Sequence, residues 1–129
     1  MTYEAEALAR QLAQLGKDLD LGTAVLGQLE ALCTEAEGAY RIAVNRHQGV
    51  LDRAYLAGTG TVDDRKAQAR LHARGQQEEL EQAWRQWRMA RDAVHLQEKS
   101  LSALAQRIDI GRSLLSHEKS LMSLGTGGA

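Results

Sequence analysis

The chain has 129 residues, the length of one small domain, and a formal net charge of −1 at pH 7. A charge this close to zero excludes a uniformly basic or uniformly acidic protein. The sequence has no proline and no phenylalanine, and alanine and leucine supply most of its hydrophobic residues. Because these residues favour helices and proline interrupts them, the composition predicts an all-α fold.

A short first helix is predicted over residues 2–15, with Thr2 as its N-cap. The segment GKDLDLG at 16–22 combines two glycines with charged residues, and this composition predicts a break. A long second helix follows over about 19–57. Its small and apolar residues recur with the 3.6-residue period of an amphipathic helix, and this stripe consists of Gly22, Val25, Leu29, Leu32, Ala36, Tyr40, Ala43, His47, Leu51, Ala54 and Gly58.

The segment AGTGT at 57–61 predicts a sharp turn over residues 58–62. Thr61, followed three positions later by Asp64, is typical of a helix N-cap. One long helix or several helices are then expected over about 63–124, and a kink near Gly75 or Gly111 is compatible with the pattern. We therefore interpret residues 1–124 as a single helical domain and residues 125–129 as a flexible tail.

Apolar residues recur every seven positions through the second half of the chain, at Leu80, Trp87, Val94, Leu101, Ile108, Leu115 and Met122. A weaker second series lies three positions after these residues, at Ala83, Ala90, Gln97, Leu104, Gly111 and Glu118. A sevenfold repeat is typical of helices packed as in a coiled coil, and it predicts a long antiparallel helical hairpin. Because alanine buries little surface, we also expect a homo-oligomer.

Several classes of protein lack support in the sequence. Cys33 is the single cysteine, so no internal disulfide is expected and a reducing compartment is favoured. No run of 18 apolar residues and no basic leader is present, which predicts a cytoplasmic protein that does not enter a membrane. The histidines are scattered, without the spacing of metal ligands, so we expect no metal, no cofactor and no enzyme.

Both tryptophans lie in the segment AWRQWRMARDAVHLQEK at 83–99. Trp87 belongs to the sevenfold series and is predicted to lie in the core. Trp84 lies on a cationic arc of about 100°, together with Arg70, Arg74, Arg88, Arg91, His95 and Lys99. Two interpretations stay open: Trp84 stacks on a nucleobase while the arginines bind phosphates, or an arginine lies over its ring at a helix interface.

A second basic cluster surrounds the predicted turn. Residues 1–40 carry a net charge of −5, whereas residues 41–75 carry +4, so acidic and basic surfaces are expected to be separate. Around the turn, the candidate phosphate-binding residues are Arg46, Arg53, Tyr55, Arg65, Lys66 and Arg70. The alternative is that these cations pair with Asp52, Asp63 and Asp64 in a solvated loop flank.

The segment RAYLAGTG at 53–60 follows an acidic N-terminal third and precedes a charged helix, and the chain ends with LSALAQRIDIGRSLLSHEKSLMSLGTG at 101–127. This layout resembles that of phage UvsY-type recombination mediators. The resemblance implies a ring-like homo-oligomer that binds single-stranded DNA and helps load a RecA-type recombinase onto strands coated with single-strand-binding protein. It also implies oligomerisation through the C-terminal helix, at Leu101, Leu104, Ile108, Leu114, Leu115, Leu121 and Met122.

The sequence thus predicts an oligomeric, non-catalytic recombination mediator that binds single-stranded DNA in the cytoplasm, the host cytoplasm if the protein is phage-encoded. The alternative is a non-catalytic coiled-coil interaction protein, either a scaffold or a phage inhibitor of a host defence complex. The predicted nucleic-acid-binding residues are Arg46, Arg53, Tyr55, Arg65, Lys66, Arg70, Arg74, Trp84, Arg88, Arg91, His95 and Lys99.

Overall fold

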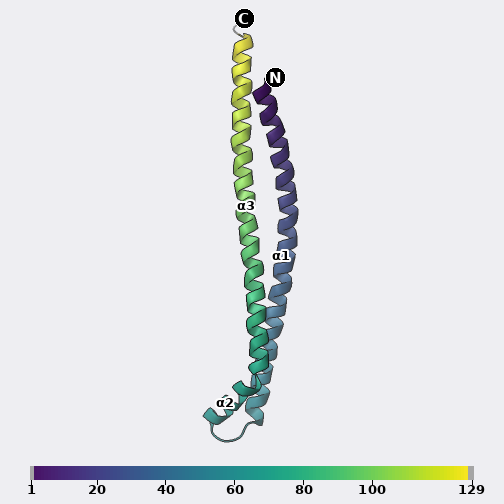
Figure 1. The fold of residues 1–129 in the computed structure, drawn as a ribbon. Helices are drawn as coiled ribbons and strands as arrows, with labels where there is room; N and C mark the ends of the chain where they lie inside the picture. Colours follow the sequence, from purple (N-terminus) through teal and green to yellow (C-terminus); the bar gives the residue numbers. More distant parts are fainter. Residues whose placement is uncertain (1, 128–129) are drawn as a thin grey trace. The chain divides into compact units, whose positions relative to one another are not determined.

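A computed structural model describes residues 2–127 of the chain. These residues form three α-helices, α1 (Tyr3–Ala57), α2 (Val62–His72) and α3 (Arg74–Gly127), and contain no β-strand (Figure 1). The predicted all-α fold is therefore confirmed. Most of the chain lies in α1 and α3, which are each more than 50 residues long.

The predicted break at 16–22 is wrong, and with it the separate short helix over 2–15, because α1 runs without interruption from Tyr3 to Ala57. Thr2 does cap this helix, since its hydroxyl accepts a hydrogen bond from the amide of Ala5 at 3.1 Å. A glycine inside a helix costs about 1 kcal/mol relative to alanine, which a packed helix can absorb. Gly22 is packed in this way, because the Gln97 side chain donates a hydrogen bond to its carbonyl at 2.9 Å.

The predicted turn after α1 is confirmed, and Gly60 adopts a positive φ of 95° there. Thr61 forms a complete capping box with Asp64: the Asp64 amide donates to the Thr61 hydroxyl, and the Thr61 amide donates to the Asp64 carboxylate. The side-chain amide of Gln68 adds two hydrogen bonds with the backbone of Thr59, at 3.2 and 3.0 Å. Two side chains of α2, Asp64 and Gln68, thus fix the turn through hydrogen bonds to the backbone of Thr61 and Thr59.

The helical region after the turn is divided into α2 and α3 at Ala73, two residues before the predicted kink at Gly75. Ala73 is almost fully buried, and its amide donates to the carbonyl oxygens of Ala69 and Leu71. At the other end, α3 continues to Gly127, so the predicted tail over 125–129 begins too early. The last two residues of that tail lie outside the described residues.

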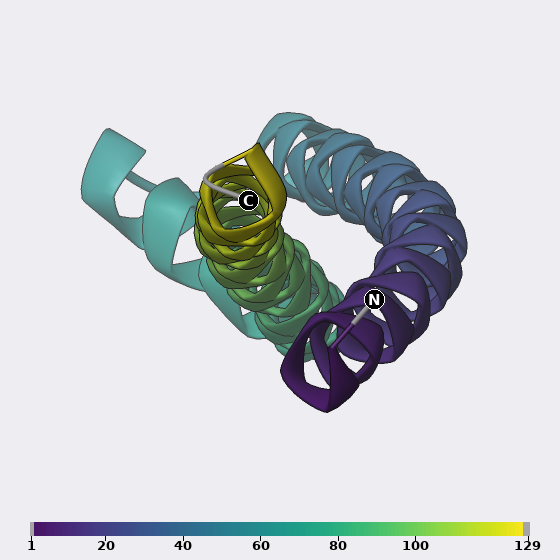
Figure 2. The same ribbon diagram turned by 90° about the horizontal axis from the view of Figure 1, so that it is seen from above.

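The chain divides into two units, and both α1 and α3 contribute to each. Unit 1 contains the residues up to Gln28 and those from His95 onward. Within it, Leu12 lies against Gly111 and Leu101 against Gly22, so that the two helical segments run in opposite directions (Figure 2). Unit 2 comprises Leu29–Val94 and contains the turn and α2.

The sevenfold series predicted the packed face of α3 correctly. All seven of its members are buried or half-buried, and so are the six residues of the weaker second series. The stripe predicted for α1 is less well covered, because Val25 and Leu32 remain 42% and 56% exposed. No large side chain among the described residues is fully buried. The packed faces therefore form a thin layer of contacts rather than a thick core.

Candidate nucleic-acid interface

Six predicted cations of unit 2 lie before and after the turn along the chain, and we call them the tip cations. They come from the end of α1, from α2 and from the first residue of α3, and they are Arg46, Arg53, Arg65, Lys66, Arg70 and Arg74. Five of them are exposed, and Arg65 is half-buried beside the turn. Tyr55 also lies on α1 in this region, but its side chain is half-buried.

The tip cations have no acidic partner among the described residues. In the part of the chain that the structure describes, the two ion pairs join Arg41 to Glu37 at 2.7 Å and His95 to Glu98 at 3.8 Å. The acids near the turn are used differently: Asp52 accepts a hydrogen bond from the Gln48 side chain at 2.8 Å. Asp64 caps α2, and the hydrogen bonds from Thr61 lower the pKa of its carboxyl, which keeps it ionised. The predicted alternative of paired cations is therefore not what the structure shows.

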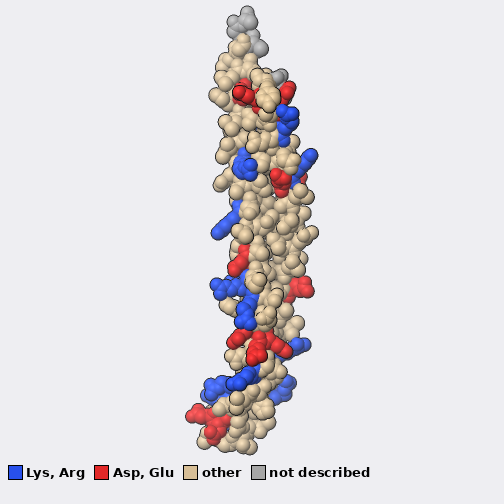
Figure 3. All heavy atoms as spheres, in the orientation of Figure 1, with Lys and Arg blue, Asp and Glu red and all other residues tan. Residues whose placement is uncertain are grey.

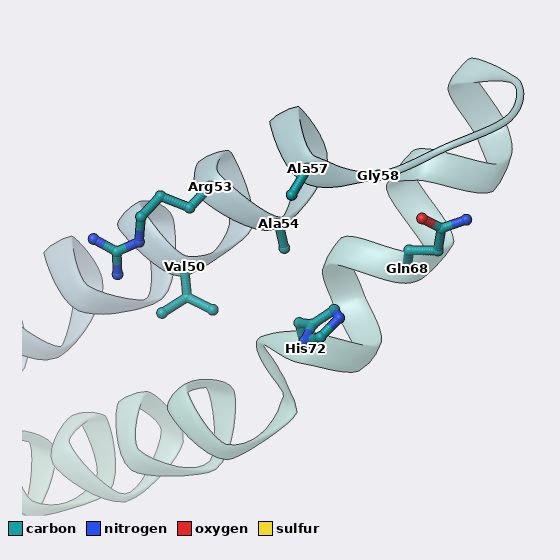
Figure 4. A pocket seen from close by; sticks show the side chains of 7 residues that line it. All are labelled: Val50, Arg53, Ala54, Ala57, Gly58, Gln68 and His72. Atoms are coloured by element: carbon teal, nitrogen blue, oxygen red, sulfur yellow. The ribbon is translucent and has the colours of Figure 1, made fainter.

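A cavity of about 390 Å³ lies at the turn, between the last turns of α1 and α2 (Figure 4). Its residues are Val50, Arg53, Ala54, Ala57, Gly58, Gln68 and His72. Gly58 leaves room there, because a Cβ atom at this position would lie 2.9 Å from the Gln68 side-chain oxygen and 3.3 Å from the Ala54 carbonyl oxygen, so these groups would have to shift. His72 was not among the predicted site residues, although its position four residues after Gln68 places both side chains on the same face of α2.

The two tryptophans occupy different environments within unit 2. Trp87 is half-buried and stacks on Tyr40, with ring centroids 5.3 Å apart and an interplanar angle of 26°. Trp87 thus packs on the facing helix, but it is half-buried and not a fully buried core residue as predicted, and the sequence did not identify Tyr40 as its partner. Trp84 is 42% exposed, and the Arg88 guanidinium carbon lies 5.3 Å from its ring centroid. Arg91 takes the same position over Trp87, at 5.5 Å.

Two residues of the predicted cationic arc belong to unit 1 and not to unit 2, namely His95 and Lys99. His95 is the histidine that pairs with Glu98, whereas Lys99 has no ion pair among the described residues. The other predicted residues, namely the tip cations, Tyr55, Trp84, Arg88 and Arg91, all belong to unit 2.

The predicted oligomerisation residues fall into two groups within unit 1. Leu114 and Leu121 are half exposed, at 51% and 50%. The other five are buried or half-buried, and they are Leu101, Leu104, Ile108, Leu115 and Met122. Leu101 faces Gly22 of the same chain. Only the first group thus keeps a large free surface for contact with another molecule.

Charges are mixed on the surface that Figure 3 shows: basic and acidic side chains alternate along α1 and α3, with basic groups near α2 beside an acidic cluster. Among residues 2–127, no three His, Cys, Asp or Glu side chains are grouped so that they could hold a metal ion. Within the same residues, no helix combines the length and the apolar character needed to span a bilayer.

Comparisons of the chain with protein-family models, with curated proteins and with solved structures find no match. The resemblance to UvsY-type mediators therefore stays a prediction from the sequence pattern.

Proposed function

We propose that the protein is a non-catalytic accessory protein that binds single-stranded DNA. The observation that carries this proposal is the group of tip cations without acidic partners in unit 2, which also contains the exposed ring of Trp84. Unpaired arginine and lysine side chains bind phosphates and release counterions, and an exposed aromatic ring stacks on an unpaired base. Duplex DNA offers no such unpaired base.

In this proposal α1 and α3 are the arms of a long antiparallel hairpin, and the C-terminal leucines join several copies, in a ring if the resemblance holds. Each copy contributes a small basic surface, and assembly joins these surfaces into a longer track for the strand. Arg88 neutralises a phosphate beside the base that stacks on Trp84. The cellular role is that of a recombination mediator, which helps a RecA-type recombinase replace single-strand-binding protein.

Salt dependence tests the electrostatic part of the proposal. If each subunit neutralises about three phosphates of a single strand, raising salt from about 50 to about 200 mM weakens binding about 20-fold. The measurement is the fluorescence anisotropy of labelled oligo-dT titrated with the protein at both salt concentrations. An affinity that does not change with salt contradicts the proposal.

Matched variants test the residues. Trp84→Ala is expected to weaken oligo-dT binding at least about fivefold, the lower limit for losing one stacked base. Arg53→Ala is expected to reduce the salt slope, because it removes a phosphate contact. Arg41→Ala is the control: Arg41 lies in the same unit but already pairs with Glu37, so its removal should leave the affinity unchanged. Equal losses for Arg53→Ala and Arg41→Ala would contradict the assignment of the tip cations.

The second candidate function is a non-catalytic coiled-coil interaction protein, a scaffold or an inhibitor of a host defence complex. The mixture of basic and acidic side chains in Figure 3 favours it, because a strand-binding surface is normally more uniformly basic. The same oligo-dT titration separates the two functions. Absence of binding at low salt would leave the interaction protein as the supported function.

A further inference from the structure

Unit 2 has an open apolar groove between α1 and α3, with a volume of about 550 Å³. We call it the alanine groove, because five of its residues are alanines; its residues are Leu29, Leu32, Glu35, Ala36, Ala39, Ala83, Gln86, Met89, Ala90 and Ala93. Leu32 and Met89 stand beside the alanines and are 56% and 70% exposed. Glu35 is the one charged side chain of the groove. Depletion of charge is typical of the centre of a protein interface.

The chain also exposes more surface than a compact protein of its mass. Its accessible surface is 9376 Å², whereas a compact monomer of the same mass exposes about 6,800 Å². The excess of about 2,600 Å² is larger than the total area buried in a standard protein interface, about 1,600 Å². Because no large side chain among the described residues is fully buried, a second pair of helices would complete a core that one pair leaves open.

We propose that the alanine groove binds the alanine groove of a second copy of this chain, forming a four-helix dimer. The same surface provides both parts of such an interface. Leu32 and Met89 are the protruding side chains, and the alanines leave the spaces into which these side chains of the other copy insert. A two-fold symmetric interface requires this self-complementarity, because each surface meets its own copy.

The polar residues of the groove select the orientation. The side chains of Glu35 and Gln86 make no hydrogen bond or ion pair with another described residue, and each has groove residues on both sides along its helix. A two-fold axis parallel to the helices places α1 of one copy on α3 of the other, so Glu35 accepts a hydrogen bond from the Gln86 amide of the second copy. Neighbouring helices then run antiparallel throughout. An axis perpendicular to the helices would instead bring the two Glu35 carboxylates together, which is unfavourable.

Sedimentation equilibrium of the full chain without nucleic acid tests the surface. Leu32→Glu places a carboxylate in the groove and is expected to raise the dimer dissociation constant at least about tenfold. Leu56→Glu is the matched control: it is the same change on the same helix, at a leucine that is 78% exposed and outside the groove. Circular dichroism verifies that both variants stay helical. A wild-type chain that is monomeric in the micromolar range, or equal effects of the two variants, would overturn the proposal.

A charge exchange tests the orientation. Gln86→Glu places a second carboxylate opposite Glu35 and is expected to weaken the dimer at neutral pH. Adding Glu35→Gln to the same chain restores one amide and one carboxylate at each contact, so the dissociation constant should return towards the wild-type value. The single variant Glu35→Gln separates the two axes: under the parallel axis it removes a carboxylate–amide contact, so the dimer should be no tighter than the wild type. Under a perpendicular axis it would relieve the repulsion between the two Glu35 carboxylates. A dimer strengthened by Glu35→Gln, or a double variant that does not restore association, would overturn the parallel two-fold axis. Because no DNA is present, either result is independent of the proposed strand binding.

Discussion

Units 1 and 2 are built from the same two long helices, yet they use different side chains to hold these helices together. In unit 1, leucines cover glycines: Leu101 lies against Gly22 and Leu12 against Gly111. In unit 2, the Tyr40–Trp87 stack and many alanines take this role. A leucine on a glycine fills the space between two helices, whereas facing alanines leave part of it open.

This difference explains where the two units keep free surface. Unit 1 joins its segments by close side-chain contacts and by the Gln97–Gly22 hydrogen bond, which links residues 75 positions apart. Unit 2 keeps an open groove, an exposed tryptophan and the unpaired tip cations. The close contacts of unit 1 thus serve the fold of the single chain, and its free apolar surface includes Leu114 and Leu121 near the C-terminus, whereas unit 2 keeps free surface in the groove between its helices and around the turn.

The largest effect is expected from the aromatic stack. Trp87→Ala removes the half-buried ring that packs on Tyr40, and we expect it to lower the free energy of unfolding by about 3 kcal/mol. Urea unfolding followed by circular dichroism measures the loss. If unit 2 depends on this stack as strongly as the comparison implies, no other single aromatic substitution in the unit should cost as much.

Trp84→Ala is the matched control for this experiment, because it is the same substitution three positions earlier on α3. Its ring is 42% exposed and contacts Arg88, a cation–π pair that contributes about 0.5–1 kcal/mol at an exposed site. We therefore expect a loss of about 1 kcal/mol or less. Equal losses for the two variants would show that Trp84 is also a core residue, and the distinction between the two rings would be wrong.

Smaller changes in stability are expected when glycines of α1 are replaced by alanine, and they should differ between packed and open positions. Gly38 in unit 2 has no atom within 4 Å of an added Cβ, so Gly38→Ala is expected to stabilise the chain by about 1 kcal/mol through helix propensity alone. Gly22→Ala should give no such gain, because its Cβ would lie 2.6 Å from Leu101 Cδ2. Gly27→Ala, also in unit 1 but in open space, controls for the unit. Thermal unfolding of the three variants ranks their stabilities. If Gly22→Ala stabilised the chain as much as Gly27→Ala, the close contact of Gly22 with Leu101 would be contradicted.

These glycines also show how far the sequence could be interpreted. The period of seven on α3 and the caps at Thr2 and Thr61 depend on local pattern, and the structure has them as predicted. The prediction of a break at 16–22 was wrong because glycine can have two opposite effects on a helix. It interrupts an isolated helix, but it also lets a distant leucine approach, and the distant residue is not visible in a local window.

For the candidate interface, too, the sequence could predict the residue types but not the contacts that they make. The sequence identified the tip cations by type, but it left open whether they pair with nearby acids. The answer depends on where those acids point: Asp64 points at the Thr61 backbone and Asp52 accepts from Gln48. The Tyr40–Trp87 contact joins two predicted packed faces, yet its register follows from the length of the turn and α2 together, which the pattern does not specify.

The smallest effect is a difference in the pH response of the two units. In unit 1, the hydrogen bond that Glu118 makes with Glu4 raises the pKa of Glu118, with burial and the Glu4 charge acting in the same direction and nearby His117 opposing them. In unit 2, the hydrogen bonds from Thr61 lower the pKa of Asp64. A raised carboxyl pKa stabilises the folded state at low pH and loses this contribution as pH rises through the folded value. A lowered pKa contributes at higher pH and loses its contribution on acidification.

Thermal unfolding between about pH 3 and about pH 7 compares Glu118→Gln with Asp64→Asn. Glutamine keeps a donor towards Glu4 but does not ionise, so Glu118→Gln should remove the part of the stability that falls as pH rises. Asp64→Asn should instead remove the part that falls on acidification, because the capping carboxylate is gone at every pH. Asp64 is exposed and Glu118 is only half-buried, so both changes are small, and their opposite sign is the decisive result. The same sign for both would mean that Glu4 and Glu118 do not share a proton, and that the ends of the helices in unit 1 are not held together there.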